Sequence, residues 1–317
     1  MPTSRWLWIL AAAAGMASAQ TTGRVIVPYP PGGSIDAMAR IVAGKLTEAT
    51  GRTFVVENRG GAAGAIGSAS VKGGPADGSL VLIAPDSNIS VYPATVAKPA
   101  YVPLDDFVAI AHTGDYRIAL SVHPSVPAQD LKSFIAWTKT QPDGVGYGTA
   151  GAGTNLHFYG VLFAHVSGAN MKHVPYRGSG PAVTDAVAGH IPALMLPFGS
   201  QLPNIKAGRL RVLAQTGENR TASAPDAPSF KELGYPMLAF PGWYGLFAPA
   251  ATPADVVNHY NDVIVKAIRT SELRERMKSL ELEPREMTAA EFQSFVKADT
   301  ERWAPIIKAS GFTPAAE

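Results

Sequence analysis

Three glycine-rich loops carry the residue types that could do chemistry in this sequence. They span residues 30–34 (PPGGS), 60–67 (GGAAGAIG) and 148–154 (GTAGAGT). Each is expected to end where a helix begins. Such a loop exposes backbone N–H groups beside the positive end of the helix dipole, and together these bind anions such as carboxylates without a charged side chain. Four residues add short side-chain donors at these loops: Ser34, Thr149, Thr154 and Asn155. The loops therefore predict an anion-binding cleft, although the same glycines would also suit tight packing of helices on strands.

Sequence patterns of other chemistries are missing. The glycines at 148, 151 and 153 are out of register for a dinucleotide-binding fingerprint, and no Walker lysine follows any loop. Neither G-x-S-x-G nor H-E-x-x-H occurs. The absence of cysteine removes disulfides and thiol catalysis. His157, His165 and His173 are evenly spaced, but they lie across a helix and the next strand. We therefore expect no metal and no cofactor.

The sequence allows two roles for each of a few single residues. Asp36 with His157 could support acid–base chemistry at Ser34, but Asp36 also suits the positive end of a helix. Arg177, in the turn YRGSG, would either pair with a ligand carboxylate or lie on a surface turn. Trp243 and its neighbour Tyr244 would be core aromatics or one wall of the cleft, with the core favoured.

Short apolar strands alternate with amphipathic helices, which is typical of parallel α/β sheets. Two halves of the chain open in the same way, with a strand, a glycine-rich loop and a helix, starting at Arg24 and Val145. We expect Ser34 to cap the first helix and Gly51 to end it. We expect Pro181 to open a later helix, and Thr288 with Glu291 to form a capping box. The expected strands cover 24–27, 53–57, 80–84, 145–147, 171–176, 191–196 and 210–214, and the expected helices cover 35–49, 63–71, 129–140, 155–166, 181–189 and two stretches after 252 and 288.

The first residues predict export. Residues 1–19 combine Arg5, a short apolar stretch and an Ala-Ser-Ala cleavage site, as in a secretory signal peptide, so that Gln20 would begin the mature chain. Of the 317 residues 46% are hydrophobic and 16% are charged, and the net charge is only +2 without a run of basic residues. This composition favours a folded protein and argues against nucleic acid as the partner. We expect a periplasmic protein.

Several segments together resemble one family, the Bug or TctC-like solute receptors of tripartite tricarboxylate transporters. They follow in family order over nearly all of the mature chain. They read VPYPPGGSIDAMARIVAGKL from residue 27, VVENRGGAAGAIGSASVKGGPADGSLVLIA from 55, YVPLDDFVAIA from 101, YGTAGAGTNLH from 147, HVPYRGSGPAVTDAVAGHI from 173, KAGRLRVLA from 206 and WYGLFAPAATPADVV from 243. Each motif is loose by itself, whereas the ordered set is specific.

The resemblance implies the fold class and the domains. The fold would be α/β, a two-lobed periplasmic binding protein of type II that closes on its ligand by a hinge motion. Two crossovers would lie near residues 112–117 and 237–244. Lobe 1 would take residues 20–114 and 241–317, and lobe 2 residues 115–240.

The resemblance also implies the binding site. Family ligands are mostly small carboxylates, held between loops of the two lobes. The matching positions here are Tyr29, Gly32, Gly33, Ser34, Asp36, Ala62, Ala63, Gly64, Thr149, Ala150, Gly151, Thr154 and His157. Arg177 is added as a candidate from its turn.

The sequence departs from the family pattern at two segments. PDSN replaces a Thr/Ser- and Gly-rich stretch, which brings Asp86 and Ser87 to the mouth of the cleft. There the Asp86 carboxylate would meet an ammonium or a hydroxyl group of the ligand. Residues 191–198 are more apolar than usual. We therefore expect a ligand with a carboxylate at one end and an apolar or aromatic body.

The function that follows is a periplasmic receptor, not an enzyme, that captures a small carboxylate for a tripartite tricarboxylate-type transporter. Its partners would be that ligand and the membrane subunits, and the receptor would be a monomer. Two alternatives stay open. One is a secreted α/β hydrolase using Ser34 or Thr154, and the other is a ligand sensor for a membrane signalling protein.

Overall fold

A six-stranded mixed sheet forms the centre of lobe 1. The computed structural model describes residues 22–313. In this range β1 (Gly23–Val27), β2 (Phe54–Asn58) and β3 (Leu80–Pro85) run parallel. β10 (Gly242–Pro249) is antiparallel to β3 and to β4 (Phe107–Tyr116), and β11 (Leu282–Glu283) lies at the edge in the order β11-β4-β10-β3-β1-β2. The helical segments of this lobe are α1 (Ser34–Thr50), η1 (Ala62–Gly64), α2 (Ala65–Ala69), η2 (Ser87–Val91), η3 (Tyr92–Ala94), α3 (Pro103–Asp106), α8 (Ala254–Ile268), α9 (Ser271–Ser279) and α10 (Ala289–Ala309).

Lobe 2 is built on a five-stranded sheet in the order β7-β6-β8-β5-β9. β6 (Val145–Thr149) is parallel to β7 (Met171–Pro175) and β8 (Ala193–Pro197). β5 (Ile118–Val122) is antiparallel to β8 and β9 (Arg211–Gln215). The helical segments here are α4 (Leu131–Lys139), α5 (Asn155–Ser167), α6 (Ser179–Val187), α7 (Phe198–Lys206) and η4 (Pro236–Leu238).

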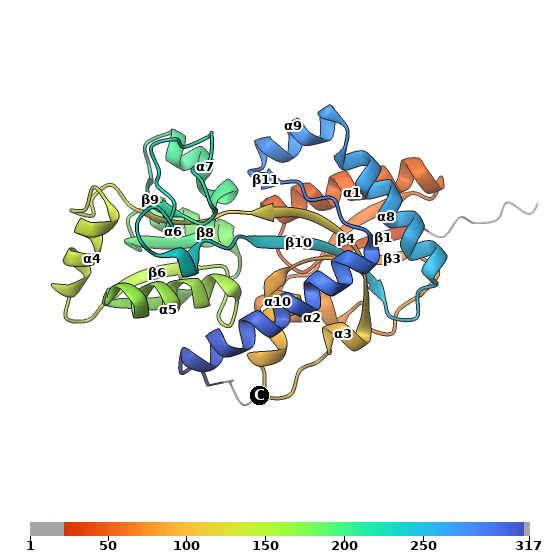
Figure 1. Cartoon of the computed structure of the whole chain (residues 1–317), viewed down its shortest axis with the longest axis horizontal. Helices are drawn as coiled ribbons and strands as arrows, with labels where there is room; N and C mark the ends of the chain where they lie inside the picture. Colours follow the sequence, from red (N-terminus) through yellow and green to blue (C-terminus); the bar gives the residue numbers. More distant parts are fainter. Residues whose placement is uncertain (1–21, 314–317) are drawn as a thin grey trace, which may run out of the picture.

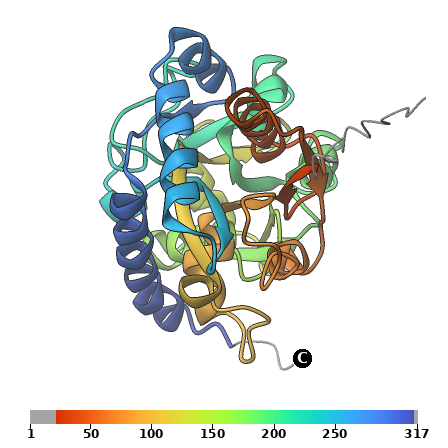
Figure 2. The same cartoon turned by 90° about the vertical axis from the view of Figure 1, so that its right-hand side faces the viewer.

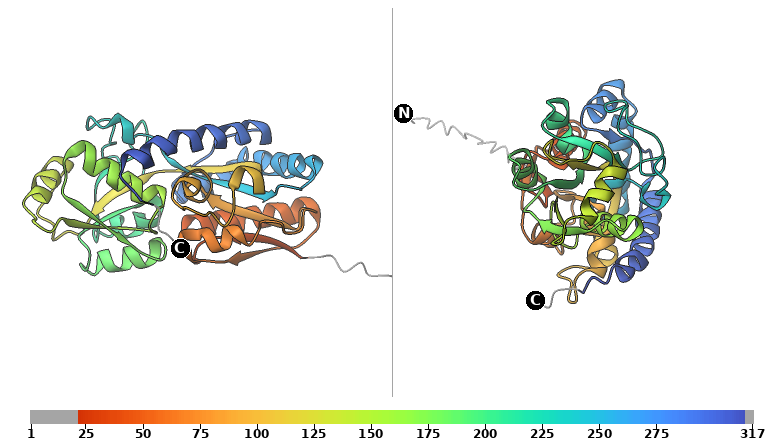
Figure 3. Two further views of the ribbon diagram at one scale, coloured as in Figure 1. Left: turned by 90° about the horizontal axis from the view of Figure 1, so that it is seen from below. Right: turned by 90° about the vertical axis from the view of Figure 1, so that its left-hand side faces the viewer.

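The chain passes between the two lobes twice, as expected for this fold class (Figure 1). The first passage is Arg117, because β4 ends at Tyr116 in one sheet and β5 begins at Ile118 in the other. The second lies between η4 and β10. The long helix α10 belongs to lobe 1 by sequence order but runs along both lobes, as the view from below shows (Figure 3). It packs on β4 and η2 and also contacts α5. The α/β two-lobed fold with two crossovers is thus confirmed.

The sheet of lobe 1 is covered on both faces, which explains its apolar strands. Successive residues of β1 point to opposite faces. Val25 and Val27 pack in one core with Met38 of α1 and with α8, whereas Ile26 packs in the second core with Phe292 of α10. Figure 2, which views this lobe end-on, shows α8 in light blue and α10 in dark blue. A strand buried on both faces needs a continuous apolar run.

The expected local signals are confirmed at most helix ends. Gly51 ends α1 with φ +68°, and Thr288 and Glu291 form the capping box of α10. Two expectations are wrong. Gly33, not Ser34, is the N-cap residue of α1, and no side chain caps this helix. The later helix α6 begins at Ser179, so that Pro181 lies within its first turn.

The expected signal peptide, residues 1–19, lies outside the described residues. Within residues 22–313, no helix is both long enough and apolar enough to span a bilayer.

Candidate ligand-binding site

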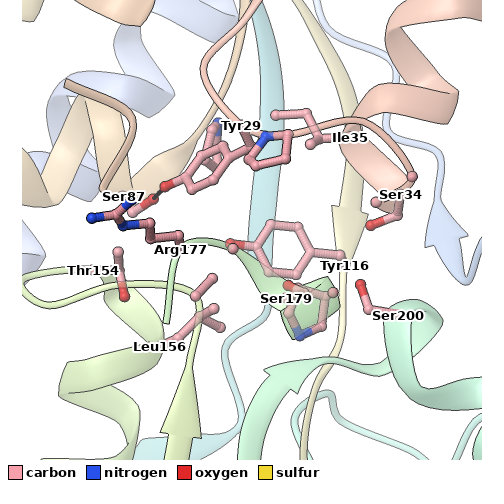
Figure 4. A pocket seen from close by; sticks show the side chains of 18 of the residues that line it. Tyr29, Ser34, Ile35, Ser87, Tyr116, Thr154, Leu156, Arg177, Ser179 and Ser200 are labelled. Carbon is pink, nitrogen blue, oxygen red and sulfur yellow. Dashed lines mark hydrogen bonds between the residues drawn. The ribbon is translucent and has the colours of Figure 1, made fainter. Parts of the chain in front are cut away.

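A cavity of about 230 Å³ lies between the two lobes. It is smaller than the ~300–1,000 Å³ that is usual for drug-sized ligands, so it suits a small solute. Figure 4 shows side chains from both lobes around it. The lining residues are Tyr29, Pro30, Pro31, Gly32, Gly33, Ser34, Ile35, Pro85, Ser87, Tyr116, Ala150, Thr154, Asn155, Leu156, Arg177, Gly178, Ser179, Gly180, Pro181, Pro197, Ser200 and Tyr244.

Four helices begin at this cavity. The first residues of three of them line it: Ser34 of α1, Asn155 of α5 and Ser179 of α6. At α7 the lining residues are Pro197, just before the helix, and Ser200, its third residue. The preceding strands β1, β6, β7 and β8 end there, and ligands bind at the carboxyl ends of strands in such sheets. The positive ends of four helix dipoles therefore meet at one small volume. No side chain among the described residues caps α1, α6 or α7, so their first N–H groups stay unpaired by a cap, whereas the Leu156 and His157 amides of α5 donate to Asn155 and Thr154. This arrangement can hold an anion.

The first loop contributes its residues as expected, with one change of role. Tyr29, Gly32, Gly33 and Ser34 all line the cavity. The Ser34 hydroxyl does not cap α1 but lies 2.8 Å from the Tyr244 hydroxyl. Burial raises the pKa of the Tyr29 phenol to about 12, so that it stays a neutral donor and acceptor.

Asp36 lies behind the first loop and is not among the lining residues. Its carboxylate accepts hydrogen bonds from the Gly32 amide at 3.2 Å and from Asn58 at 3.0 Å, and it pairs with Arg40 at 3.2 Å. Burial alone would raise its pKa, but these hydrogen bonds outweigh burial, and the pKa lies below its ordinary value. Asp36 thus fixes the shape of the loop as an anion.

The second loop supports the site from behind. Ala62, Ala63 and Gly64 are not among the lining residues. Instead the Ala63 carbonyl accepts hydrogen bonds from the Tyr29 hydroxyl at 2.9 Å and from the Asn88 amide at 3.1 Å. Ala62 and Ala63 have positive φ angles of 45° and 51°, which turns that carbonyl toward Tyr29. The loop positions Tyr29 rather than exposing donors to a ligand.

Some residues of the third loop line the cavity, and others only support it. Ala150 and Thr154 line the cavity, and Thr149, Gly151 and His157 do not. The Thr154 hydroxyl caps α5 by accepting from the His157 amide, and it donates to the Gly151 carbonyl at 2.8 Å. Its hydrogen-bonding capacity is thus used mainly within the loop.

The His157 ring stacks on the His173 ring below this loop, with their centroids 3.8 Å apart. Burial lowers the pKa of His157 to about 4, and burial together with His157 lowers that of His173 to about 3. Both rings are therefore neutral near pH 7. His173 lies 2.7 Å from the Thr149 hydroxyl and so supports the loop from inside lobe 2.

The expected place of Asp86 at the mouth of the cleft is wrong. Its side chain is fully buried and is not among the lining residues, whereas the neighbouring Ser87 is. Asp86 accepts hydrogen bonds from the Tyr116 hydroxyl at 2.8 Å and from the Asn155 amide at 2.9 and 3.0 Å. It cannot meet an ammonium or hydroxyl group of a ligand in this arrangement, because Tyr116 and Asn155 stand between.

Arg177 lies at the cavity, and no acidic side chain among the described residues pairs with it. It is also the one ionisable side chain, apart from tyrosines, among the lining residues. An unpaired guanidinium suits a carboxylate, which it can bind with two hydrogen bonds.

Sequence reasoning missed part of the lining. Tyr244 lies at the cavity, whereas the sequence favours a place in the core, and no sequence signal marks Tyr116, which also lines it. Gly178 and Ser179 open α6, and a Gly-Ser pair before a helix is the same signal that identified the first loop. The apolar segment 191–198 was also misread, because Leu194, Met195 and Leu196 are buried in β8 and only Pro197 lines the cavity. The apolar lining comes instead from Ile35, Leu156, prolines and tyrosines.

No cluster of three His, Asp or Glu side chains suited to a metal ion occurs within residues 22–313. Two lobes joined by two crossings, with an anion-suited cavity between them, define a two-lobed solute-binding protein. The chain belongs to the family of tripartite tricarboxylate transporter receptors, whose sequence profile matches residues 38–312.

Named relatives agree with this assignment. Protein BugT of Bordetella pertussis is 32% identical over 289 residues, which cover 91% of this chain and 89% of BugT. A solved structure of a periplasmic transporter is 36% identical, with a TM-score of 0.88 over 93% of this chain and 98% of that one. A Rhodopseudomonas palustris protein solved with adipate has 27% identity and the same TM-score and coverage. Another from that organism, MatC with bound malate, has 25% identity and a TM-score of 0.84 over 90% and 98%. This chain is a solute-binding receptor of that family.

Proposed function

We propose that the protein is a non-catalytic periplasmic receptor for a small carboxylate with an apolar body. The observation that carries the proposal is the make-up of the cavity, where four helix N-termini and Arg177 meet and where no carboxylate side chain from residues 22–313 lines the wall. An anionic ligand would find donors there and no repelling charge. The adipate-bound and malate-bound structural neighbours support a carboxylate.

The distribution of polar groups narrows the ligand further. In Figure 4, Arg177, Ser87 and Thr154 lie on one side of the cavity, and Ser34 and Ser200 lie on the other. The Tyr29 and Tyr116 rings lie between these two sides, together with the apolar side chains of Ile35 and Leu156. A linear dicarboxylate such as adipate fits this pattern, with one carboxylate at Arg177 and the other at the serine hydroxyls and helix ends.

Calorimetric titration with adipate, malate, citrate and benzoate tests this ligand class. We expect adipate to bind more tightly than citrate, because the Tyr29 and Tyr116 hydroxyls in the middle of the cavity already donate to the Ala63 carbonyl and to Asp86, which leaves neither for a third carboxylate. Binding of citrate alone would contradict an apolar body. Mass spectrometry of ligand that copurifies with the native protein would identify the natural solute directly.

A hydrolase remains the second candidate, and the surroundings of Ser34 argue against it. The partner of its hydroxyl is Tyr244, whose pKa burial raises above its ordinary value, which makes the neutral phenol a poor general base. The Thr154 hydroxyl is held by the α5 cap. Turnover of an ester panel that disappears in Ser34→Ala would establish the hydrolase instead.

The remaining parts of the proposal concern place and partners. We propose that residues 1–19 direct export and are removed, and that the monomeric receptor closes its lobes, 20–116 with 241–317 and 118–240, before it docks on membrane transporter subunits. The boundary differs from the expected residue 114, because Asp115 and Tyr116 still pair within the sheet of lobe 1. A sensor role would use the same closure with a signalling partner. N-terminal sequencing of the periplasmic fraction should find Gln20 first. Uptake of the bound solute in a gene-deletion strain separates transport, where uptake is lost, from sensing.

A further inference from the structure

The buried carboxyl of Asp86 lies on the boundary between the two lobes. Asp86 follows β3 of lobe 1, and its side chain has no exposed surface. One of its partners, Tyr116, is the last residue of β4 in the same lobe. The other, Asn155, is the first residue of α5 in lobe 2. The carboxyl therefore joins the lobes through hydrogen bonds.

The side chains of Asp86, Asn155 and Tyr116 all hydrogen-bond to one another. The Asn155 amide nitrogen donates to Asp86 Oδ1 at 2.9 Å and to Oδ2 at 3.0 Å, and it lies 2.7 Å from the Tyr116 hydroxyl. Asp86 Oδ1 also accepts from the Ser87 amide at 3.0 Å. The Asn155 carbonyl oxygen accepts from the Leu156 amide, which fixes the orientation of its side chain. The Asn155 amide therefore points at Asp86 and not away from it.

Asp86 differs from its two partners in that it does not reach the cavity. Tyr116 and Asn155 both line the cavity, and Asp86 does not. A ligand therefore touches the two side chains that Asp86 holds in place, but not Asp86 itself. When the lobes separate, Asn155 must leave Asp86, because the two residues belong to different lobes.

We propose that Asp86 is a positioning residue that holds the closed state, by anchoring Asn155 and Tyr116 at the floor of the cavity. This inference rests on the proposed function in one respect, since it takes lobe closure to be the binding event. Without Asp86 the buried Asn155 amide keeps only the Tyr116 hydroxyl as an acceptor for its two N–H groups in the closed state, whereas water supplies acceptors in the open state. Leaving a buried donor without a partner is more costly than never forming the bond. The loss therefore falls on the closed state.

A pair of engineered cysteines can measure closure without a ligand. Ala63 of lobe 1 and Gly151 of lobe 2 are close neighbours, since a Cβ built on Gly151 would lie 3.0 Å from the Ala63 Cβ. A disulfide needs ~3.5–4.5 Å between its Cβ atoms, so a shift of about half an ångström would seat the bond. The natural chain has no cysteine, so the variant Ala63→Cys/Gly151→Cys would hold one thiol pair. The rate of disulfide formation under a mild oxidant then follows the closed population. The readout is free-thiol titration over time in the full-length protein.

Two variants in this background test Asp86. Asp86→Asn keeps the size of the side chain but places an NH₂ group against the Asn155 NH₂ group, 3.0 Å away at the present Oδ2 position. Asn155→Ala removes the partner from the other lobe. We expect each variant to slow disulfide formation about tenfold, which corresponds to ~1.4 kcal/mol in the closure equilibrium. The double variant should be no slower than either single one, because both changes break the same contact.

Asn261→Ala is the matched control. Asn261 is also a buried asparagine, and its amide donates to the Ile110 and Met287 carbonyls within lobe 1. This change should lower thermal stability but leave the crosslinking rate unchanged. Equal rates for the parent, Asp86→Asn and Asn155→Ala would overturn the proposal, as would additive effects in the double variant.

Affinity for adipate provides the second readout and separates the two proposals. If adipate binds, Asp86→Asn should weaken its affinity about tenfold, although Asp86 does not touch the cavity. An adipate affinity that Asp86→Asn leaves unchanged would contradict the positioning role. If no carboxylate binds while crosslinking still depends on Asp86, the proposed ligand class fails and the role of Asp86 stands.

Discussion

The Ser34 hydroxyl lies 2.8 Å from the Tyr244 hydroxyl, and this contact joins residues 210 positions apart at the wall of the cavity. Ser34 opens α1 and Tyr244 belongs to β10, the strand that returns the chain to lobe 1. Both hydroxyls are therefore held in place before a ligand arrives, and such preorganisation favours binding.

We expect Tyr244→Phe to weaken the binding of adipate several-fold, because a hydrogen bond of this kind contributes ~0.5–1.5 kcal/mol. Calorimetry measures the change. Tyr260→Phe is the matched control, since the Tyr260 hydroxyl donates to the Gly78 carbonyl away from the cavity. Equal losses in both variants would show that Tyr244 acts through general stability alone.

Arg177 should contribute more than any hydroxyl. We expect Arg177→Gln to weaken adipate binding by about tenfold to a hundredfold, because charge-assisted hydrogen bonds contribute ~1.5–3 kcal/mol. The difference in affinity between the parent and Arg177→Gln should shrink at high salt, because screening weakens adipate binding to the parent. Arg209→Gln, an exposed arginine of the same lobe that is not among the lining residues, serves as the control. If the two arginine variants bind adipate alike, the Arg177 guanidinium does not pair with the ligand.

Closure should respond to pH through Asp86. Burial, followed by the negative charge of Asp299, raises the pKa of Asp86 well above its ordinary value in the closed form. When opening exposes the carboxyl to water, its pKa returns toward the ordinary value. Closure therefore binds a proton, so that it is favoured at low pH and weakens as the pH rises toward the raised pKa. The proton would lie on Oδ1, which is 2.8 Å from the Tyr116 hydroxyl, so that Oδ2 still accepts from the Asn155 amide. The titratable and charged groups near Asp86 are Asp299 and Arg302 of α10, Tyr116 of β4, Tyr159 of α5, Tyr244 of β10 and Tyr29 after β1.

The cysteine pair measures this effect if each rate is divided by that of Asp86→Asn at the same pH, which cancels the titration of the thiols. We expect this ratio to fall as the pH rises from the ordinary pKa of an aspartate toward the raised pKa of Asp86. A ratio that stays constant would mean that Asp86 keeps one protonation state in both forms.

The stacked His157 and His173 rings should make lobe 2 sensitive to acid. Their pKa values are lowered to about 4 and about 3 by burial, so the unfolded chain binds protons first as the pH falls. Stability is therefore complete above the unfolded value of about 6.5 and is lost progressively below it. His173→Gln, which can still hydrogen-bond Thr149, should reduce the fall in Tm between about pH 7 and about pH 5. His259→Gln on α8, outside this stack, should leave that fall unchanged.

Trp303 ties α10 to the second lobe. It is fully buried and packs edge-on against Tyr159 of α5, with ring centroids 5.6 Å apart, and against Phe240, at 5.4 Å. Trp303→Ala should lower the free energy of unfolding by ~3–5 kcal/mol, the usual effect of truncating a buried aromatic residue. Trp137→Ala, at a half-buried position of α4, should lower the free energy of unfolding by less. Denaturant unfolding measures both, and a small effect at Trp303 would mean that α10 packs without it.

The sequence by itself determined the alternation of strands and helices, the helix ends at Gly51 and Thr288, and the presence of glycine-rich loops before helices. These features depend on neighbours within a few residues, such as a glycine that accepts positive φ or a hydroxyl that caps the next turn. The first loop and half of the third were found in this way. The ordered motifs also identified the family, because their spacing covers the whole mature chain.

Only the tertiary structure decided which loop faces the ligand and which supports another loop. Ala63 and Gly33 lie in similar glycine-rich sequences, but Ala63 points its carbonyl at Tyr29, whereas Gly33 lines the cavity. Asp86 follows a strand end like a ligand-binding residue, yet Asn155 from the other lobe covers it. Burial of a polar group depends on segments distant in the chain, and for Asp86 that contact exists only when two lobes meet. Local sequence carries no record of such a contact, because its free energy arises from excluding water between surfaces that folding brings together.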